Sequence, residues 1–355
     1  MLLKRLVITT KFETLSMVSH TQIEQLNSVD CALFDIDGVL VDVRDSYSLA
    51  IKMTIEFMTK LMIGTSFSRK QVPDTLLLKF KQTGGFNNEV DICYAIILAL
   101  MSRPINESPS DKRHFLFTVA ENADETGIFS VEKYLSKFLT PSHIEKLKAN
   151  LVYPAPVGKS LLPTVFDEFF YGPVLFQEQH NMKPLYYHGK PLIENDKMII
   201  SDKTLKIISK KFHGNIATIS GRSRIAAQHT LRPIFKTFNP MASVFLEDED
   251  RKHWKPNPYS IKRAMDYLGA KTAFYVGDSI EDLYMAKQAE RDADNKIIFV
   301  GVYGCSVRPD ETLRKFIDGH ADIVIKNVNN LFQLVDNTDH NGMGKKAYEL
   351  DRFIV

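Results

Sequence analysis

From residue 201 to residue 335, short apolar segments alternate with helical ones. We predict strands at 216–220, 243–246, 273–276, 297–301 and 321–325, and helices at 201–212, 223–232, 258–268, 280–290 and 328–335. Such alternation is typical of a parallel sheet with helices on both faces. The apolar run at 31–36 is predicted to be a further buried strand of the same sheet. We therefore expect an α/β fold with a three-layer, Rossmann-like parallel sheet core.

A long segment separates the first predicted strand from the others. It contains predicted helices at 45–63, 71–82, 89–101, 112–121, 130–139 and 141–150. Residues 153–194 are rich in proline, glycine and aromatic residues, and we predict loops there with a short hairpin around 186–193. We therefore expect a mostly helical insertion at 43–200, and a core made of 1–42 and 201–355. Residues 1–29 are predicted to form a leader strand or helix.

Composition narrows the classes of protein that fit. The chain has 355 residues, of which 44% are hydrophobic, and this is ample for a packed core. Its formal net charge of +2 favours neither a nucleic-acid partner nor an acidic membrane surface. Its three cysteines are far apart in the sequence, so we expect buried thiols in a reduced, cytoplasmic setting. We expect neither a membrane span nor a signal peptide.

Two carboxylates end the first predicted strand. Asp35 and Asp37 are two positions apart, so on a strand both side chains would project to the same face. Adjacent carboxylates are costly to desolvate unless a cation or hydrogen bonds offset them. Gly38 then permits a turn. The pattern indicates a metal-assisted site at a strand end, although an acidic turn that caps a helix would read the same way.

Two later segments carry groups that suit an anion. Ser220 and Gly221 end the strand at 216–220, where a hydroxyl and backbone N–H groups could bind a phosphate. The same pair is common in turns and helix caps. Lys255 lies between Trp254 and Pro256, just before a predicted helix, and could neutralise a phosphate or a carboxylate. An exposed lysine in a proline-rich turn is the alternative.

A second acidic pair follows the strand at 273–276. Asp278 comes directly after Gly277, and Asp282 lies one turn into the helix that follows. With Asp35 and Asp37, Asp278 could provide the few carboxylates that Mg²⁺ prefers. The alternative is that these acids simply complement a helix dipole. Because the ends of parallel strands share one edge of a sheet, the groups named here would meet there.

The order and context of these motifs resemble the haloacid dehalogenase superfamily. The resemblance covers residues 31–42 and 201–335, and its four motifs match Asp35-Ile-Asp37-Gly38, Ser220, Lys255 and Gly277-Asp278-Ser279-Ile280-Glu281-Asp282. It is nearest to subfamily I, the phosphoglycolate-phosphatase-like branch, because the insertion lies between the first and second motifs. The insertion would then be a substrate-reading cap domain, longer than the small caps of that branch.

The resemblance implies a role for each motif residue. Asp35 would be the nucleophile that forms an aspartyl-phosphate, and Asp37 would protonate the leaving oxygen and then activate water. Lys255 would neutralise charge in the transition state, while Ser220 and the Gly221 amide would bind the phosphoryl oxygens.

The same resemblance implies a Mg²⁺ cofactor. Its ligands would be Asp35, the backbone carbonyl of Asp37, and Asp278, with Asp282 bound directly or through water. An acid at the position of Asp37 is absent from the family's dehalogenases, so its presence favours phosphoryl transfer.

Substrate specificity is expected from the insertion, where the sequence is least informative. The best candidate loop contains Gly85, Phe86, Asn87 and Asn88, although it could equally be a helix C-cap followed by an N-cap. Arg44 and Arg222 could reach a second acidic group on the substrate, or pair at the surface. The aromatic residues between 166 and 187 are expected to form the core of the insertion or a homodimer contact.

The leading hypothesis is a Mg²⁺-dependent phosphomonoester hydrolase that acts on a small phosphorylated metabolite. The runner-up is a phosphomutase, which would transfer the phosphoryl group to a second hydroxyl. A different class of protein is also open: a non-catalytic phosphometabolite-binding or assembly protein whose enlarged cap blocks turnover.

Overall fold

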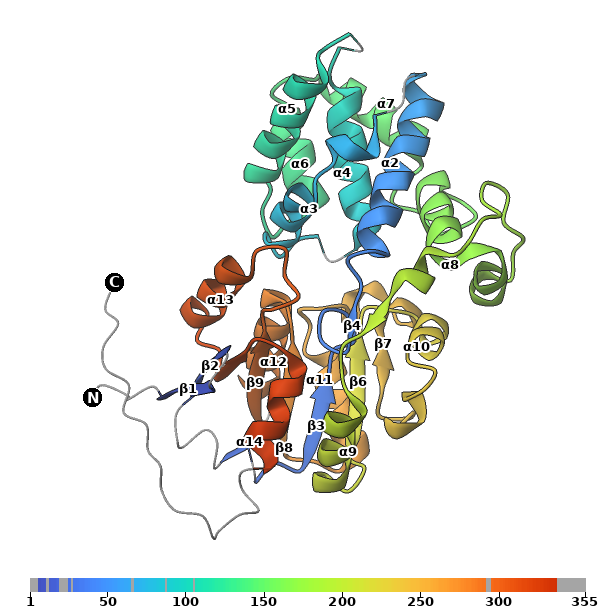
Figure 1. Ribbon diagram of the computed structural model, residues 1–355. Helices are drawn as coiled ribbons and strands as arrows, with labels where there is room; N and C mark the ends of the chain where they lie inside the picture. Colours follow the sequence, from blue (N-terminus) through green and yellow to red (C-terminus); the bar gives the residue numbers. More distant parts are fainter. Residues whose placement is uncertain are drawn as a thin grey trace. The chain divides into compact units, whose positions relative to one another are not determined.

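The computed structural model places residues 6–10, 13–18, 25–26, 28–64, 67–86, 88–104, 106–291 and 295–336. The chain forms two compact units, each described here by itself (Figure 1). The first comprises Met1–Asp42 and Lys197–Val355 and contains the sheets; the second, Val43–Asp196, is helical. Among the placed residues, no helix combines the length and the apolar character needed to cross a membrane.

The first unit is built on a six-stranded sheet in which all neighbouring strands pair in parallel. The spatial order is β10-β9-β8-β3-β6-β7. The strands are β3 (Cys31–Phe34), β6 (Ile216–Ser220), β7 (Val244–Phe245), β8 (Thr272–Gly277), β9 (Lys296–Val302) and β10 (Ile323–Ile325). The predicted parallel α/β sheet is thus confirmed. Because β3 lies between β8 and β6, the three strands that carry acidic or hydroxyl residues at their carboxyl ends are direct neighbours.

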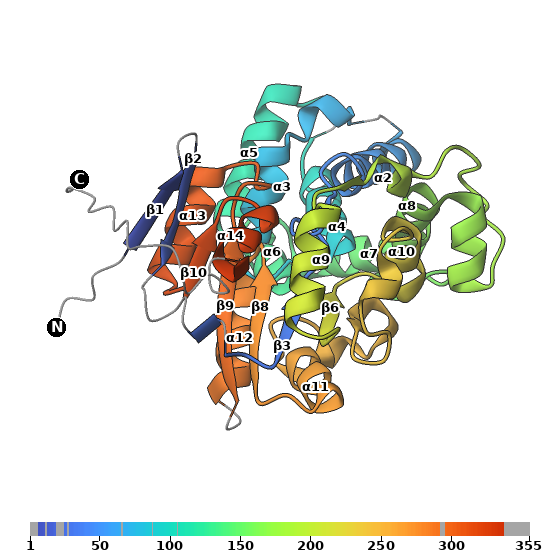
Figure 2. The ribbon, with the colours of Figure 1, turned by 60° about the horizontal axis from the view of Figure 1, so that its bottom comes forward.

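Helices cover both faces of this sheet (Figure 2). They are α9 (Asp202–Lys211), α10 (Arg224–Thr230), α11 (Tyr259–Leu268), α12 (Ile280–Arg291), α13 (Pro309–Asp318) and α14 (Leu331–Asp336). Helix α13 was not predicted from the sequence. Its Phe316 is fully buried and packs on Phe299 of β9, with ring centroids 5.7 Å apart.

Two antiparallel strand pairs complete the first unit. Strands β1 (Leu6–Thr10) and β2 (Glu13–Val18) pair with each other, so the described part of the leader segment contains two antiparallel strands. Strands β4 (Val41–Asp42) and β5 (Lys197–Met198) join the two chain segments that border the helical unit. Short 3₁₀ turns lie between the larger elements: η3 (Phe235–Thr237), η4 (Leu246–Asp248), η5 (Arg251–His253) and η6 (Val328–Asn330).

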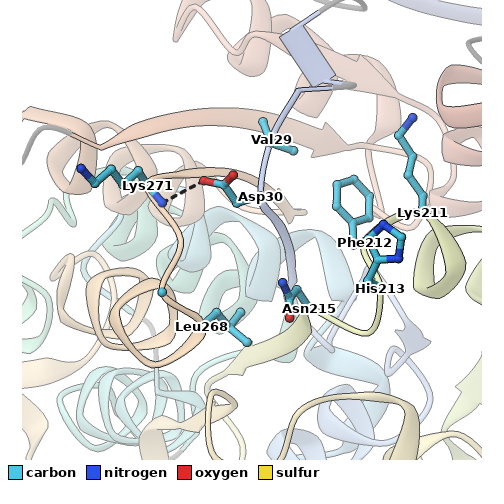
Figure 3. A pocket seen from close by; sticks show the side chains of 9 residues that line it. Val29, Asp30, Lys211, Phe212, His213, Asn215, Leu268 and Lys271 are labelled. Carbon is cyan, nitrogen blue, oxygen red and sulfur yellow. Dashed lines mark hydrogen bonds between the residues drawn. The ribbon is translucent and has the colours of Figure 1, made fainter.

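The amino edge of the sheet carries a hollow of about 630 Å³ (Figure 3). Asp30, just before β3, accepts hydrogen bonds from the backbone N–H groups of Lys271 and Thr272, each at 2.9 Å. These bonds lower the pKa of Asp30 below 3.8. The side chains of Lys211 and Lys271 lie on opposite sides of the hollow. This edge is opposite the strand ends that carry the predicted site residues.

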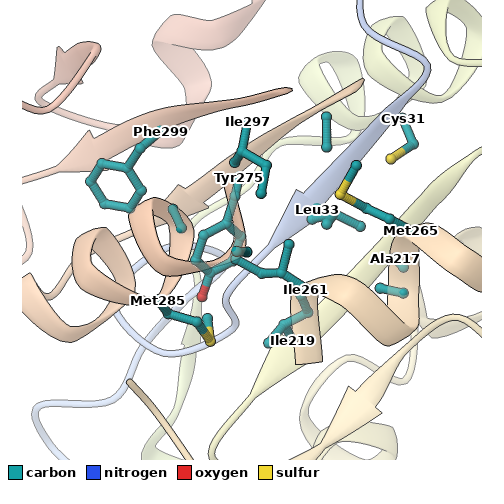
Figure 4. Packing of buried hydrophobic residues seen from close by; sticks show 14 of the residues in the cluster. Cys31, Leu33, Ala217, Ile219, Ile261, Met265, Tyr275, Met285, Ile297 and Phe299 are labelled. Atoms are coloured by element: carbon teal, nitrogen blue, oxygen red, sulfur yellow. The ribbon is translucent and has the colours of Figure 1, made fainter. Parts of the chain in front are cut away.

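The core follows the period-two alternation of buried strands. Cys31 and Leu33 of β3 face a cluster that includes Ile261 and Met265 of α11 and Tyr275 of β8 (Figure 4). The intervening Phe34 points to the opposite face, where it meets Phe274 edge-on with centroids 5.7 Å apart. Both faces of β3 are therefore buried, as a central parallel strand requires.

The second unit is a bundle around one central, mostly apolar helix. Its helices are α2 (Tyr47–Ile63), α3 (Asp74–Lys81), α4 (Glu89–Met101), α5 (Pro109–Glu121), α6 (Ile128–Leu135), α7 (Pro141–Leu151) and α8 (Leu161–His180), with 3₁₀ turns η1 (Arg69–Gln71) and η2 (Leu192–Asn195). The central helix is α4, in which every residue from Val90 to Leu100 is buried. A helix that is buried on every side must be surrounded, and α2, α5, α6, α7 and α8 pack against it.

Helix α8 corrects the prediction that residues 153–194 are loops. Pro163 lies in the first turn, where its missing N–H has no helical partner to lose, and Gly172 (φ 63°) with Pro173 bends the helix. The proline and glycine residues, which usually interrupt helices, therefore lie at positions where this helix can accommodate them. The buried aromatic residues of α8 belong to the core of this unit: Phe166, Phe169, Phe170, Tyr171 and Phe176.

The hairpin predicted around 186–193 is also wrong. Those residues form a loop that leads into η2. Buried Glu168 of α8 holds this loop, because its carboxylate accepts the backbone N–H groups of Leu185, Tyr186 and Tyr187 at 2.6–2.8 Å. In a hairpin, these backbone N–H groups would form hydrogen bonds between two strands. Here the carboxylate of Glu168 accepts them instead.

Candidate active site

Asp35 lies at the carboxyl end of the central strand. Its backbone N–H donates to the carbonyl of Val276 at 2.8 Å and so continues the β3–β8 ladder. Its Oδ1 accepts the N–H of Ile36 at 2.7 Å, and only 5% of the residue is exposed. The strand therefore fixes both the position and the orientation of this carboxylate.

Lys255 contacts Asp35 directly. The Lys255 Nζ lies 2.8 Å from Oδ2 of Asp35 and 2.7 Å from Oδ1 of Asp282. The residue follows η5, and its peptide bond to Pro256 is cis. Burial opposes the charge on Lys255, but the carboxylates of Asp282 and Asp35 outweigh it and raise its pKa well above the ordinary value. The lysine is therefore charged and confined within the site, and is not an exposed residue of a proline-rich turn.

Asp282 is fully buried and accepts four hydrogen bonds. Its Oδ1 accepts from Lys255 and from the Tyr275 hydroxyl at 2.6 Å, and its Oδ2 accepts from the N–H and hydroxyl of Ser279 at 3.1 and 2.7 Å. Ser279 Oγ in turn accepts the N–H of Asp282 at 3.1 Å, which is a reciprocal cap at the start of α12. Burial alone would raise the pKa of Asp282, but Lys255 and the hydroxyl donors lower it. Asp282 is thus an anion that holds Lys255 in place.

Asp278 packs against the backbone of Gly38. Gly38 has a φ of +71°, and a Cβ there would lie 1.9 Å from Oδ2 of Asp278. Only glycine lets the turn after β3 approach this carboxylate so closely. Asp35, Asp278 and Asp282 each offer an oxygen, and these oxygens lie within 4.8 Å of one another. An all-oxygen carboxylate cluster suits a hard divalent cation such as Mg²⁺.

Charge balance points to the same class of ligand. Burial, followed by repulsion from Asp282 and Asp37, raises the pKa of Asp35 to about 7, although Lys255 opposes the shift. Lys255 pairs with Asp35 and Asp282, and Arg222 pairs with Asp37. A divalent cation beside Asp35, Asp278 and Asp282 would further offset the repulsion between their carboxylates.

Asp37 pairs with Arg222. The Arg222 Nε donates to Oδ1 of Asp37 at 2.5 Å, and the Arg222 side chain is completely buried while that of Asp37 is 28% exposed. From the sequence, Arg222 was expected to reach the substrate or to pair at the surface. In the structure its side chain is instead buried inside the protein, where it pairs with Asp37.

Ser220 and Gly221 lie at the end of β6, beside β3. The Ser220 side chain is buried, and its Oγ accepts the N–H of Arg222 at 3.2 Å. A hydroxyl that accepts one hydrogen bond can still donate its own proton to an anion. A Cβ at Gly221 would meet nothing within 4 Å, so this turn borders open space.

The residues predicted in the specificity loop serve the helical unit itself. Phe86 is fully buried against Phe80, with ring centroids 4.9 Å apart, and Asn88 caps α4 by accepting the N–H of Val90 at 2.8 Å. This is the helix-capping alternative. Gly85 is pressed against Gly127, since a Cβ on Gly85 would lie 2.5 Å from the Gly127 nitrogen.

Two further residues, Arg44 and Asn87, were predicted to take part in substrate specificity. Arg44 is an exposed residue of the helical unit, and Asn87 lies outside the described residues. A role for any of these cap residues in specificity stays a prediction.

Tyr275 is a site residue that was not named from the sequence, and Ser279 was named only as a member of the fourth motif, without a role. Tyr275 was treated only as part of an apolar strand, yet its hydroxyl is a polar group in a buried segment and requires a partner. Because side chains alternate along β8, Tyr275 faces α12, which carries Asp282. A tyrosine inside an otherwise apolar strand that ends in aspartates is therefore a signal that could have been used.

Comparison with known proteins finds one family model and several solved structures that are similar to this chain. Residues 193–290 match the family model described as a haloacid dehalogenase-like hydrolase. No match was found among curated proteins. The structure is similar to that of phosphatase Tt82 from Thermococcus thioreducens, with 22% identity, a TM-score of 0.50, and coverage of 81% of this chain and 99% of that one.

A structural genomics target solved by X-ray crystallography also matches. The two chains share 17% identity with a TM-score of 0.58, and the alignment covers 88% of this chain and 100% of the other. At these identities the likeness concerns the fold alone. The family match covers residues 193–290, and the parallel sheet agrees with the fold of these neighbours, so the chain is similar to the haloacid dehalogenase-like hydrolases in this region.

Proposed function

We propose that the protein is a Mg²⁺-dependent phosphomonoester hydrolase of a small phosphorylated metabolite. The observation that carries this proposal is the pairing of Asp35 with Lys255 beside the carboxylate of Asp278. This arrangement combines a nucleophile, a cation that stabilises transferring negative charge, and an oxygen-rich metal site. The match of residues 193–290 to a hydrolase family model supports the same reaction class.

The first chemical step would be attack by the Asp35 carboxylate on phosphorus. The bond between phosphorus and the ester oxygen breaks as the Asp35–phosphorus bond forms, and Asp37 gives a proton to the departing oxygen. Lys255, fixed by Asp282, would face the charge that develops on the phosphoryl oxygens. The Ser220 hydroxyl and the backbone after it would donate to those oxygens from the neighbouring strand.

The second step would release phosphate and restore the enzyme. Asp37, now a carboxylate, takes a proton from water, and the water oxygen attacks phosphorus as the bond to Asp35 breaks. A metal bound by Asp35, the backbone carbonyl of Asp37 and Asp278 would neutralise and orient the phosphoryl group. Asp282, whose oxygens already accept four hydrogen bonds, would act on Lys255 or on the metal through water.

Phosphate release tests the proposal. Purified protein should hydrolyse 4-nitrophenyl phosphate with added Mg²⁺ and lose this activity with a chelator. Asp35→Asn removes the nucleophile with little change in shape, and it should abolish turnover, whereas Asp318→Asn, a change in α13, should not. A screen over sugar, glycol, nucleotide and amino-alcohol phosphates would then identify the substrate class.

Two results would contradict the proposal. Isomerisation of sugar phosphates with little net phosphate release would indicate a phosphomutase. Ligand-dependent stabilisation without turnover of any phosphate in the screen would indicate a binding protein.

A further inference from the structure

Arg222 is the largest side chain that the described structure buries completely. Three groups of this one residue are held at once. Its Nε donates to Oδ1 of Asp37 at 2.5 Å, its Nη1 donates to Oγ1 of Thr230 at 2.8 Å, and its backbone N–H donates to Oγ of Ser220 at 3.2 Å. Arg222 therefore links the turn after β3, the end of β6 and the last residue of α10.

A buried arginine of this kind is rare without a specific use. Its charge is costly to bury, and the ion pair to Asp37 offsets the cost only because the geometry is close. The planar guanidinium fixes the direction of each N–H bond, which a lysine at this position could not do. The Asp37 side chain, in contrast, is 28% exposed, so burial alone does not fix its carboxylate, and the Arg222 Nε holds one of its two oxygens.

We propose that Arg222 is a positioning residue for proton transfer by Asp37. Its Nε binds Oδ1 of Asp37. This contact sets the plane in which the Asp37 carboxyl meets the departing oxygen of the substrate. The inference rests on the proposed function, because it assigns Arg222 to the proton-transfer step of that reaction. It gives Arg222 no contact with the substrate.

The dependence of kcat/KM on the basicity of the leaving group distinguishes a positioning role of Arg222 from a purely structural one. A leaving oxygen of low basicity departs without a proton, whereas a basic one needs the acid. Arg222→Lys and Arg222→Gln should therefore lose about 100-fold in kcat/KM on phenyl phosphate and less than about 10-fold on 2,4-dinitrophenyl phosphate, in line with the cost of a misplaced catalytic group. Asp37→Asn should show the same pattern, and adding Arg222→Lys to it should change the pattern no further.

Thr230→Val keeps the test decisive if the Arg222 variants do not fold. It removes the acceptor of Nη1 without altering the Arg222–Asp37 pair itself, and it should shift the leaving-group dependence in the same direction by a smaller factor. Equal losses on both substrates, or none, would overturn the positioning role. If instead the wild type releases no phosphate from either ester, the proposed function fails, and the two failures are distinguishable.

Discussion

Gly38→Ala should disable the proposed metal site without replacing any of its proposed side-chain ligands. Gly38 has a φ of +71°, where an L-residue costs about 1–2 kcal/mol. The new Cβ would also lie 1.9 Å from Oδ2 and 2.3 Å from Cγ of Asp278. Because these distances are impossible, the Asp278 side chain must leave its position, at a further cost of about 1 kcal/mol for an off-rotamer conformation.

The response to Mg²⁺ should fall as well as the stability. At a Mg²⁺ concentration of about 100 times Kd, binding stabilises the folded state by about 2.7 kcal/mol. If displacement of Asp278 weakens binding about 100-fold, the same concentration supplies only about 0.4 kcal/mol. Thermal unfolding with and without Mg²⁺ measures this increment, and phosphate release measures its effect on turnover.

Gly269→Ala is the matched control. Gly269 ends α11 with a φ of +62°, and a Cβ there would meet nothing within 4 Å. The variant therefore carries the backbone cost alone and should retain the full response to Mg²⁺. If Gly38→Ala keeps the same Mg²⁺ increment as Gly269→Ala, the assignment of Asp278 to the metal site is refuted.

Three other changes probe the supports of the fold and the site. Tyr275→Phe removes one donor from buried Asp282 and should lower the free energy of unfolding by about 1 kcal/mol in urea titrations; no loss would show that the hydroxyl is not a support. Asp30→Asn should lower the free energy of unfolding at neutral pH, because the folded state holds the Asp30 pKa below its ordinary value of 3.8. The difference in free energy from the wild type should disappear as the pH falls through that lowered pKa, and a difference independent of pH would contradict this. In the helical unit, Phe86→Ala should cost about 3–5 kcal/mol and Asn88→Ala about 1 kcal/mol, and a larger loss for Asn88→Ala would contradict the assignment of Phe86 to the core.

The parallel sheet and its acidic edge could be predicted because they leave local traces in the sequence. Each central strand is an apolar run that stops at a polar residue, and the order of those stops places Asp35, Ser220 and Asp278 at one edge. The close contact of Lys255 with Asp35 depends on a long irregular segment. Only the resemblance to a family brought those two residues together in advance.

The remaining features depend on tertiary packing. Helix α8 contains two prolines and a glycine, so the helix propensities of its residues argue against a helix. The helix becomes understandable only when these residues are seen to lie in its first turn and at its bend. Arg222 was predicted to be accessible because arginine usually is; a buried cation is recognised only when its partner, Asp37, is found 185 residues earlier in the chain. Burial that depends on distant partners cannot be read from a local pattern.

The central place of β3 has a consequence for synthesis of the chain. This strand emerges from the ribosome early, yet both of its neighbours, β6 and β8, are encoded after the entire helical unit. Residues 43–196 can form their own contacts first, while both edges of β3 remain unpaired until β6 and β8 have been synthesised. Such long-range pairing is slow and leaves an apolar strand open to misassociation. Asp35 thus follows a strand whose two neighbours are synthesised only after the helical unit.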